Sequence, residues 1–478
     1  MRLERKQLGH FEALRNLSLR KSTPPPARYA STPVPMPPER RRSPALTLLI
    51  LIMSFPLLST CGLGSSLDFR TRQVITIKVA TELPISDNDI GISTMNGAKL
   101  AVDQANANHT IPNVTLQLVQ RGHVSNSRDS AFVDIIDLLG DPQVAGIVGP
   151  LNSGVARAMM PTANNGNLAV ISPSNTDPCF TRREPEVGCG GDNDVVPLLR
   201  PTGNVTYFRL VATDDYQGLA MADYLSKTLH LKTVFVIDDA ARYGAIIAKY
   251  FVQEFKKLGG TIIDGQSHTV TSTTNYTNLL TTAAAHQPDA IYFGGIYVTG
   301  GQVIQKQMMM IPALQKKIFA GGDGMIGNPD FYKQVTDNGG TCYLSLAPPD
   351  ASKTPAAAQF VKDYTARYGT PGFYSASAFD AMNILIQAIK KALATTPAAK
   401  DANDTEGGKA FRQAVVNALK QTDYHGATGH TTFDANGDTT NRVFTIYQVA
   451  LVGGKPDLEP KDIVTLWAFE YEWTGLQR

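Results

Sequence analysis

Two successive series of alternating strand and helix patterns constrain this chain more than any other feature. Apolar runs rich in β-branched residues recur between segments whose apolar residues have helical spacing. The expected strands of the first series are 74–80, 114–120, 144–149, 168–172 and 206–211. Those of the second series are 233–238, 261–265, 289–295, 317–322 and 342–347. Such alternation predicts parallel sheets with helices on both faces, so we expect an α/β fold with two lobes.

The segment after the second series is expected to add helices and to end in paired strands. The helices are expected at about 355–369, 374–396 and 408–421, and the hairpin-like end at 431–452. The closest pair of histidines, His425 and His430, falls between them and is expected in a solvated loop. Neither they nor the other histidines show the spacing of metal ligands, so no metal is expected.

The loops that follow strands are the expected place for a binding site, because ligands of parallel α/β sheets bind beyond the carboxyl ends of the strands. The sequence contains none of the motifs HExxH, GxSxG or GKS/T. We therefore expect no enzymatic activity and no cofactor. An α/β enzyme working in the cleft remains a remote alternative.

One loop matches the pattern GxGxxG, at residues 322–327, after an expected strand. This pattern is typical of dinucleotide-binding loops. However, Asp323 would place a carboxylate in the phosphate cradle, where like charges repel. A carboxylate flanked by glycines suits a cation such as a ligand ammonium, and a plain loop is the third alternative.

The complementary anion site is expected in the first series. The segment 149–154 joins a strand to a helix that begins near Ser153, and free N–H groups at a helix start bind carboxylates. Ser153 could instead be only the N-cap of this helix. The next strand is followed by Ser174, Asn175 and Thr176, whose short polar side chains are expected at the same edge of the sheet. The alternative is a turn stabilised by its own side chains.

The N-terminal part carries the signature of an export signal. Residues 1–60 hold ten Lys and Arg against three Asp and Glu, and an apolar run at 45–58 precedes Cys61. This run is short for a membrane span, which needs about 20 residues. A cysteine at the cleavage point resembles a bacterial lipobox, so Cys61 is the expected site of lipid attachment, although Thr60 departs from that pattern. An ordinary signal peptide or a signal anchor is the alternative, and Met36 is a candidate start.

The other cysteines have different expected roles. Cys179 and Cys189 lie in one loop-like segment, and an oxidising compartment permits a disulfide between them. Cys342 falls in an expected buried strand and is expected to be a small core residue. Beyond residue 60 the chain is net acidic, which gives no electrostatic reason to bind nucleic acid.

Several of these segments together resemble the type I periplasmic solute-binding proteins of bacterial ABC importers, in the branched-chain amino acid (Leu/Ile/Val) group. The segments are NGAKLAVDQAN (96–106), AGIVGPLNSG (145–154), ISPSNTDP (171–178), DDAARYG (238–244), DAIYFGG (289–295), AGGDGMIGN (320–328) and FDANGD (433–438). The resemblance implies two Rossmann-like lobes with parallel sheets, joined by a three-strand hinge. Together with the export signal, it gives the following expected division: signal and N-terminal extension 1–60, tether 61–73, lobe 1 at 74–212 and 348–430, lobe 2 at 213–347 and 431–478.

The resemblance also implies roles for site residues. Ser153 and Thr176 would bind a ligand α-carboxylate, with backbone groups of Ser174 and Asn175 nearby. Asp323 would pair with the α-ammonium. Three tyrosines would complete the pocket, and these are Tyr243, Tyr297 and Tyr374.

We therefore expect an exported, monomeric lipoprotein at the outer face of the cytoplasmic membrane or in the periplasm. It would bind an amino acid in an interlobe cleft and deliver it to the permease of an ABC importer. The alternative is a sensor module of the same fold that reports its ligand to a separate signalling partner. The side chain of the ligand is left open by the sequence.

Overall fold

The computed structural model describes most of the chain beyond residue 73. The described ranges are 74–84, 89–122, 128–183, 189–191, 194–271 and 275–466. Cys61 and the expected export signal lie outside them. Among the described helices, none has both the length and the apolar composition that crossing a bilayer requires.

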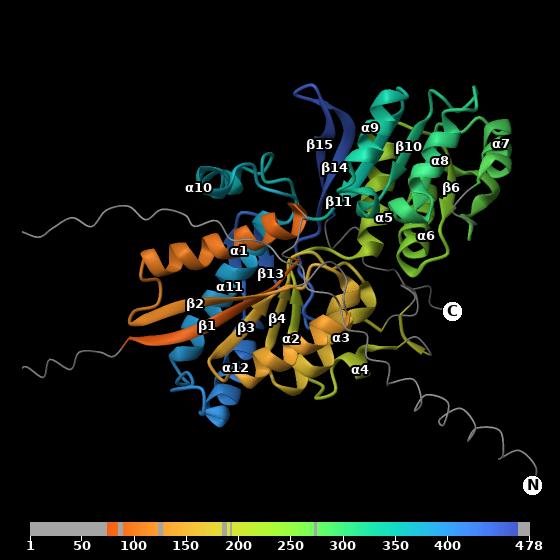
Figure 1. Cartoon of the computed structure of the whole chain (residues 1–478). Coiled ribbons are helices and arrows are strands. Elements are labelled where there is room, and N and C mark those ends of the chain that lie inside the picture. The colour runs from red at the N-terminus through yellow and green to blue at the C-terminus, as the bar shows by residue number, and fades with distance from the viewer. Residues whose placement is uncertain are drawn as a thin grey trace, which may run out of the picture. The chain divides into compact units, whose positions relative to one another are not determined.

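The first sheet is built from the first series of strands and is parallel throughout (Figure 1). Its order is β2 (Val114–Arg121), β1 (Ile75–Glu82), β3 (Val144–Val148), β4 (Ala169–Ser172) and β5 (Tyr207–Arg209). The expected strands of this series are confirmed, with shorter bounds for the last one.

Helices cover both faces of the first sheet, and the side chains of the strands alternate between them. Ile77 and Val79 of β1 pack in one apolar cluster, whereas Ala80 belongs to the cluster on the opposite face. The first cluster includes residues of α1 (Asp89–Ala107), α11 (Ser375–Leu393) and α12 (Thr405–Leu419). The second includes residues of α2 (Arg128–Gly140), α3 (Ser153–Asn165) and α4 (Val196–Leu199). This two-sided burial explains why the strands read as near-continuous apolar runs.

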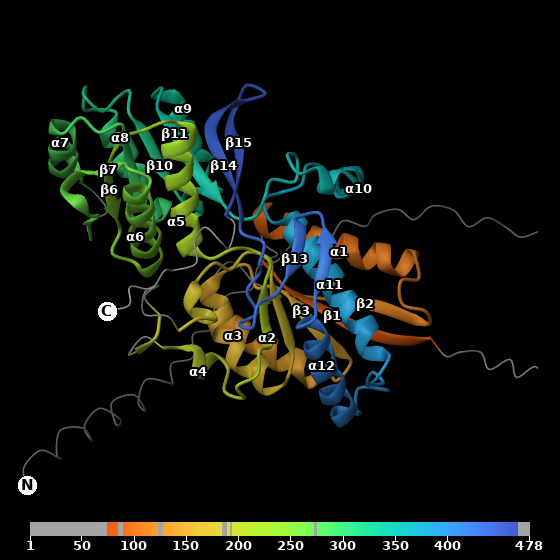
Figure 2. The same cartoon turned by 180° about the vertical axis from the view of Figure 1, so that it is seen from behind.

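The second sheet combines a parallel part with an antiparallel edge (Figure 2). Its order is β15 (Lys455–Thr465), β14 (Val443–Val452), β11 (Thr341–Leu346), β10 (Ile318–Gly321), β9 (Ala290–Gly294), β6 (Thr233–Asp238) and β7 (Thr261–Ile262), with β8 (His268–Thr269) also paired to β6. The strands from β6 to β11 are parallel, and β14 and β15 are antiparallel.

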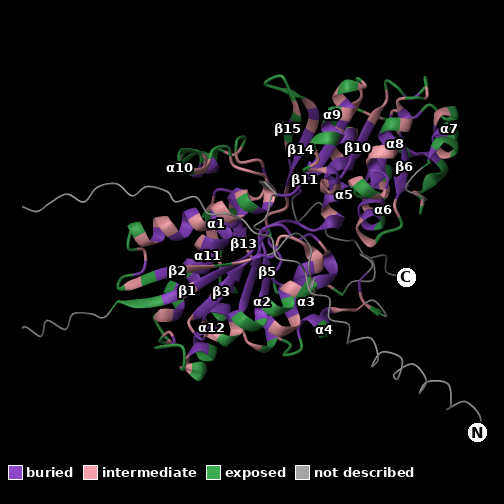
Figure 3. Cartoon of the chain, in the orientation of Figure 1, coloured by how far each residue is buried: buried purple, intermediate pink, exposed green. Residues whose placement is uncertain are grey.

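The second sheet is also covered on both faces, and its strands β6, β9, β10 and β11 are mostly buried, whereas the edge strand β15 is largely exposed (Figure 3). One apolar cluster includes α5 (Asp214–Asp223) and α6 (Arg242–Lys257). The other includes α7 (Thr277–Ala285), α8 (Gly301–Met308) and α9 (Pro329–Asp337). Cys342 lies on β11 as a free and fully buried thiol, which confirms its expected place in the core. The expected α/β class with two parallel-stranded lobes is therefore confirmed.

The chain passes more than once between the elements of the two sheets. After β11 it returns to the first sheet through α10 (Ala358–Tyr368) and α11, and it reaches the second sheet again at β14. The stretch before β14 still contacts the first sheet, because Arg209 of β5 forms an ion pair with Asp438 at 2.7 Å. We therefore propose that the last passage lies between Asp438 and Val443 rather than near residue 430.

Two features of the C-terminal part differ from the expectation. His425 and His430 lie on a two-stranded hairpin, β12 (Asp423–Gly426) and β13 (Gly429–Thr432), and not in a loop. The segment 431–452 is not a hairpin by itself, because β14 pairs with a further strand, β15. β15 carries Pro456 and Pro460, and prolines are tolerated only at the edge of a sheet, which is where β15 lies.

Candidate functional site

A cavity of about 790 Å³ lies at the carboxyl ends of strands from both sheets. This volume is typical of pockets for small molecules. Loops after β3 and β4 line it from the first sheet, and loops after β6, β9 and β10 line it from the second. Asp214 joins the lining from the start of α5, which packs on the second sheet. The polar and aromatic residues that line it include Ser153, Thr176, Asp214, Tyr243, Asp323 and Tyr374. The position is the one expected for a ligand of parallel α/β sheets.

The start of α3 provides an anion-binding wall of the cavity. Ser153 is the first residue of the helix, and the N-cap is Asn152, so Ser153 is not the cap. Its hydroxyl makes no hydrogen bond to any described residue, and the first amides of a helix have no intrahelical acceptor. Arg157, one turn further along, is exposed at the cavity and has no ion-pair partner among the described residues. The partial positive charge at the start of α3 and the full positive charge of Arg157 therefore lie on the same wall of the cavity.

The polar residues of the loop after β4 have two roles, because some line the cavity and one stabilises the loop itself. Ser174 and Thr176 line the cavity. The Asn175 side chain is used internally, since its Nδ2 donates to the Leu151 carbonyl at 2.8 Å and its Oδ1 accepts from the Tyr207 hydroxyl at 2.9 Å. Asn175 is fully buried and does not line the cavity. It fixes the loop that presents its two neighbours.

Asp323 lies on the opposite wall and is oriented by Tyr243. The Tyr243 hydroxyl donates to Asp323 Oδ1 at 2.7 Å and accepts from the Gly324 amide at 3.0 Å. Tyr243 comes from the start of α6, so the segments that follow β6 and β10 of the second sheet meet here. A Cβ at Gly322 would lie 2.3 Å from the Tyr243 hydroxyl, which excludes any larger residue.

The same contacts explain the GxGxxG pattern without a nucleotide. The Gly324 amide is bonded to Tyr243 and is not free to bind a phosphate. The carboxylate of Asp323 faces the cavity, and the helix that follows the loop begins only at Pro329. The glycines permit the close approach of Tyr243, and the described residues form no phosphate cradle.

A second carboxylate, Asp214, faces the cavity and was not anticipated from the sequence. It is the first residue of α5, its side chain is almost fully buried, and its Oδ1 has no hydrogen-bond partner among the described residues. Its amide donates to the Thr176 carbonyl at 3.0 Å, which ties it to the anion-binding side. A pair of acidic residues in the first turn of a helix is usual, because it complements the helix dipole, and does not by itself indicate a site. Its place at the start of the helix that follows β5 was the available signal.

The electrostatics of this wall favour a bound cation. Burial raises the pKa of Asp323, although hydrogen bonds from Tyr243 and Gln217 partly offset this. Burial and the nearby charges of Asp323 and Asp177 raise the pKa of Asp214 well above its usual range. Without a cation, the buried carboxyl group of Asp214 and the partly buried one of Asp323 each favour their protonated form, and a positive ligand group would stabilise both anions.

The remaining walls are aromatic and apolar. Tyr374, just before α11, lines the cavity, and burial raises the pKa of its phenol well above the usual range. Tyr297 does not line the cavity, because its ring packs against Phe331 with centroids 6.2 Å apart. Its neighbour Ile296 takes the expected position, and Phe180 contributes from the first sheet.

A disulfide stabilises one rim of the cavity. Cys179 and Cys189 are bonded, which confirms the expected pair. Arg242, at the start of α6, lies 3.5 Å from Asp177 Oδ1 and donates to Cys189 Sγ. The disulfide loop of the first sheet and a helix of the second sheet thus meet at this rim.

Comparisons with known proteins give a family match and several relatives. A family model described as "Periplasmic binding protein" matches residues 84–455. The Leu/Ile/Val-binding protein BraC3 of Rhizobium johnstonii is 26% identical over 362 residues, covering 75% of this chain and 87% of the relative.

Solved structures show the same fold. A leucine-binding protein from Thermotoga maritima superposes with a TM-score of 0.60 at 21% identity, over 82% of this chain and 99% of that one. A branched-chain amino acid transporter substrate-binding protein from Streptococcus pneumoniae, in complex with isoleucine, gives a TM-score of 0.59 at 25% identity, over 82% of this chain and 100% of that one.

Proposed function

The chain belongs to the family of periplasmic binding proteins, and from this premise we propose that it binds a small amino acid in its cavity. Membership confirms the resemblance that the sequence motifs indicated. The family consists of solute-binding proteins, and the Leu/Ile/Val-binding relative supports an amino acid as the class of ligand.

The observation that carries the proposal is the opposite charge of the two cavity walls. The start of α3, Ser153 and Thr176 offer hydrogen-bond donors to a carboxylate. Asp323 and Asp214 offer acceptors to an ammonium. An α-amino acid carries both charged groups on one carbon atom, Cα, and its side chain would lie against Tyr374 and the apolar wall.

Each carboxylate has its own part in binding the ammonium. Asp323 is positioned by Tyr243, so its acceptor atoms are oriented before the ligand arrives. Asp214 has a buried oxygen without a partner, which an ammonium N–H would satisfy. Because the two walls belong to different sheets, ligand binding would favour a closed arrangement of the lobes.

We further propose that the protein is exported, carries lipid on Cys61 and delivers its ligand to the permease of an ABC importer. The basic segment, the short apolar run and the cysteine of the N-terminal part support export and anchoring. Several acyl chains hold a protein at a membrane firmly. Cys61→Ser should move the protein from the membrane fraction to the soluble fraction, and an unchanged distribution would contradict the anchor.

A thermal-shift screen tests the proposed ligand class. The exported part, 66–478, would be heated with each common amino acid, with simple sugars and with NAD. A ligand at 100 times its dissociation constant stabilises by about 2.7 kcal/mol, which is easily detected. We expect a shift with one group of amino acids and none with the others. A shift with NAD or a sugar alone would contradict the proposal.

A further inference from the structure

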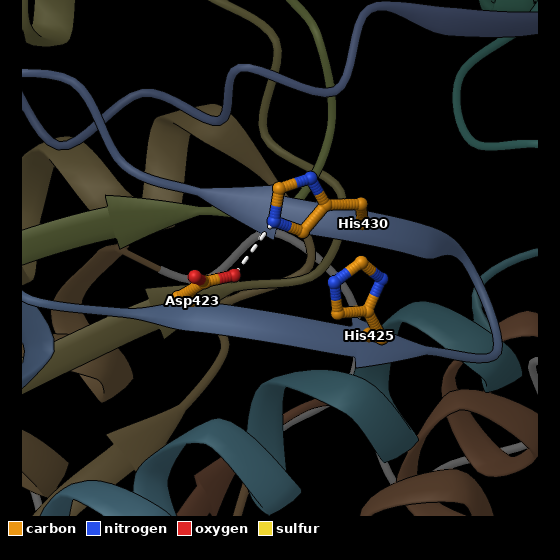
Figure 4. Close-up of side chains that lie close together, drawn as sticks. All are labelled: Asp423, His425 and His430. Carbon is orange, nitrogen blue, oxygen red and sulfur yellow. Dashed lines mark hydrogen bonds and ion pairs between the residues drawn. The ribbon is translucent and has the colours of Figure 1, made fainter.

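A second cluster of chemically active side chains lies on the β12–β13 hairpin, outside the lining of the cavity. His425 of β12 pairs directly with His430 of β13 in the strand register. Asp423 lies two residues before His425, and residues two apart on a strand point to the same face. The three side chains therefore share one face of the hairpin, and Figure 4 shows them close together.

The geometry of the cluster brings potential metal ligands together. The two imidazole rings stack with centroids 4.2 Å apart, and His430 Nε2 lies 2.7 Å from Asp423 Oδ1. One ligand atom from each residue lies within 4.8 Å of the others. All three residues are exposed, so their side chains can rotate without disturbing a core. Ligands of a tetrahedral zinc ion are ~3.3 Å apart, a contraction that such rotations allow.

A buried carboxylate fixes the backbone of this hairpin. Asp380 of α11 is fully buried and accepts hydrogen bonds from the amides of Ala427 and Thr428, at 2.9 and 2.7 Å. It also accepts from the Thr428 hydroxyl at 2.7 Å and from the Tyr424 hydroxyl at 3.3 Å. The turn between the two histidines is thus tied to a core helix, and the pair is held in register.

We propose that Asp423, His425 and His430 bind one divalent transition-metal ion, with zinc as the reference ion. Two imidazoles and a carboxylate are ligands that zinc accepts, and ions such as nickel and copper share this preference. The exposed face leaves further coordination positions open to water or to a group of another molecule. If the cluster served only the hydrogen bond between His430 and Asp423, the stacked ring of His425 would have no part in it.

Zinc titration of the full chain without a histidine tag tests the proposal. The experiment uses zinc alone, in the absence of amino acids, because free amino acids chelate the metal. We expect one site per chain, and we expect His425→Gln and His430→Gln each to weaken binding by at least 10- to 100-fold. Asp423→Asn should weaken it as well, since the carboxylate contributes one of the three ligands. Circular dichroism of each variant would establish that the fold is intact.

His286→Gln is the matched control, because His286 is also exposed and belongs to no such cluster among the described residues. It should leave zinc binding unchanged. Equal zinc affinity of the wild type and the His425→Gln/His430→Gln double variant would overturn the proposal, and so would an equal loss in the control. Neither result depends on whether the cavity binds an amino acid.

Discussion

At the scale of single residues, the carboxylates of Asp323 and Asp214 in the cavity support a ligand that carries an ammonium group. Asp323→Asn and Asp214→Asn keep the shape of each side chain but remove its charge. We expect each to weaken ligand binding by about 2 kcal/mol or more, ~30-fold, because a close charge pair is lost. Calorimetry with the ligand found by screening would measure this.

Asp330→Asn is the control for both variants, since Asp330 is exposed on α9 and does not line the cavity. It should bind the ligand as the wild type does. An Asp214→Asn protein with unchanged affinity would remove Asp214 from the site and leave Asp323 as the only acceptor.

The raised pKa values of Asp214 and Asp323 predict a coupling between ligand binding and protons. A bound ammonium favours the ionised carboxylates, so binding should release protons where they are partly protonated in the free protein. The affinity should therefore fall as the pH is lowered from neutral through the raised pKa values of the two carboxyl groups. The free energy of unfolding of the ligand-free protein should depend on pH in the opposite direction. The two carboxyl groups contribute to its stability at low pH, and this contribution is lost as the pH rises through their raised pKa values.

Calorimetry in buffers of different ionisation enthalpy would count the released protons. The release should be smaller in Asp214→Asn. An affinity that does not depend on pH in this window would show that neither carboxylate changes its ionisation on binding.

The sequence identified some of these residues and missed others for physical reasons. Asp323 stood out because glycines flank it, and the structure shows that those glycines accommodate Tyr243. Asn175 was expected at the ligand because it lies between Ser174 and Thr176, yet neighbours in a turn point in different directions. Which of them reaches a cavity depends on tertiary contacts such as the one from Tyr207, which no local pattern reveals.

At the scale of elements, the disulfide segment is tied to β5 and to the passage before β14. Arg209 is fully buried and donates to the carbonyl of Asp177, to the Thr181 hydroxyl and to Asp438. The Thr181 hydroxyl donates in turn to Asp438 at 2.9 Å. The cysteine pair therefore closes a loop that is already joined to the first sheet by a charged network.

Replacing both Cys179 and Cys189 by Ala should lower the free energy of unfolding by about 3 kcal/mol, the value expected for closing so short a loop. Urea denaturation would measure the loss. A reducing agent should lower the stability of the wild type by a similar amount and leave the double variant unchanged. If reductant destabilised both proteins equally, its effect would not arise from this bond.

The hydrogen bonds that Asp380 accepts from the β12–β13 hairpin give a second prediction at the scale of elements. Asp380→Ala leaves the buried amides of Ala427 and Thr428 without their acceptor, so we expect a loss of about 2–4 kcal/mol. Hydrogen exchange should show faster exchange of those two amides. Asp337→Ala is the control, because its ion pair with Lys333 is exposed and contributes little. Equal exchange rates in Asp380→Ala and wild type would contradict the anchoring role.

Among the elements, the strands of the two series were predictable, whereas β15 and the β12–β13 hairpin were not. β3 and β9 are buried on both faces, so their apolar runs stand out in the sequence. β15 alternates exposed charges with prolines, and it forms a strand only because the neighbouring β14 offers a free edge. The β12–β13 hairpin depends in the same way on a distant anchor, Asp380.

At the scale of the whole molecule, two sheets contribute complementary walls to one cavity. The donors come from the loops of the first sheet and Asp323 comes from a loop of the second, with Asp214 at the start of α5. Neither lobe alone offers the full set of partners to a zwitterion. This arrangement follows from the repeated strand and helix series, because each series places its loops at the carboxyl ends of its strands.

The central claim is that the cavity recognises both charges of an amino acid at once. The most direct test is calorimetry of the wild type with the amino acid found by screening, with its N-acetyl derivative and with its carboxamide. Each derivative removes one charge and keeps the side chain. We predict that both modifications weaken binding by at least ~30-fold, since each leaves one wall without its partner. Binding of the N-acetyl derivative as tight as that of the parent amino acid would contradict the account.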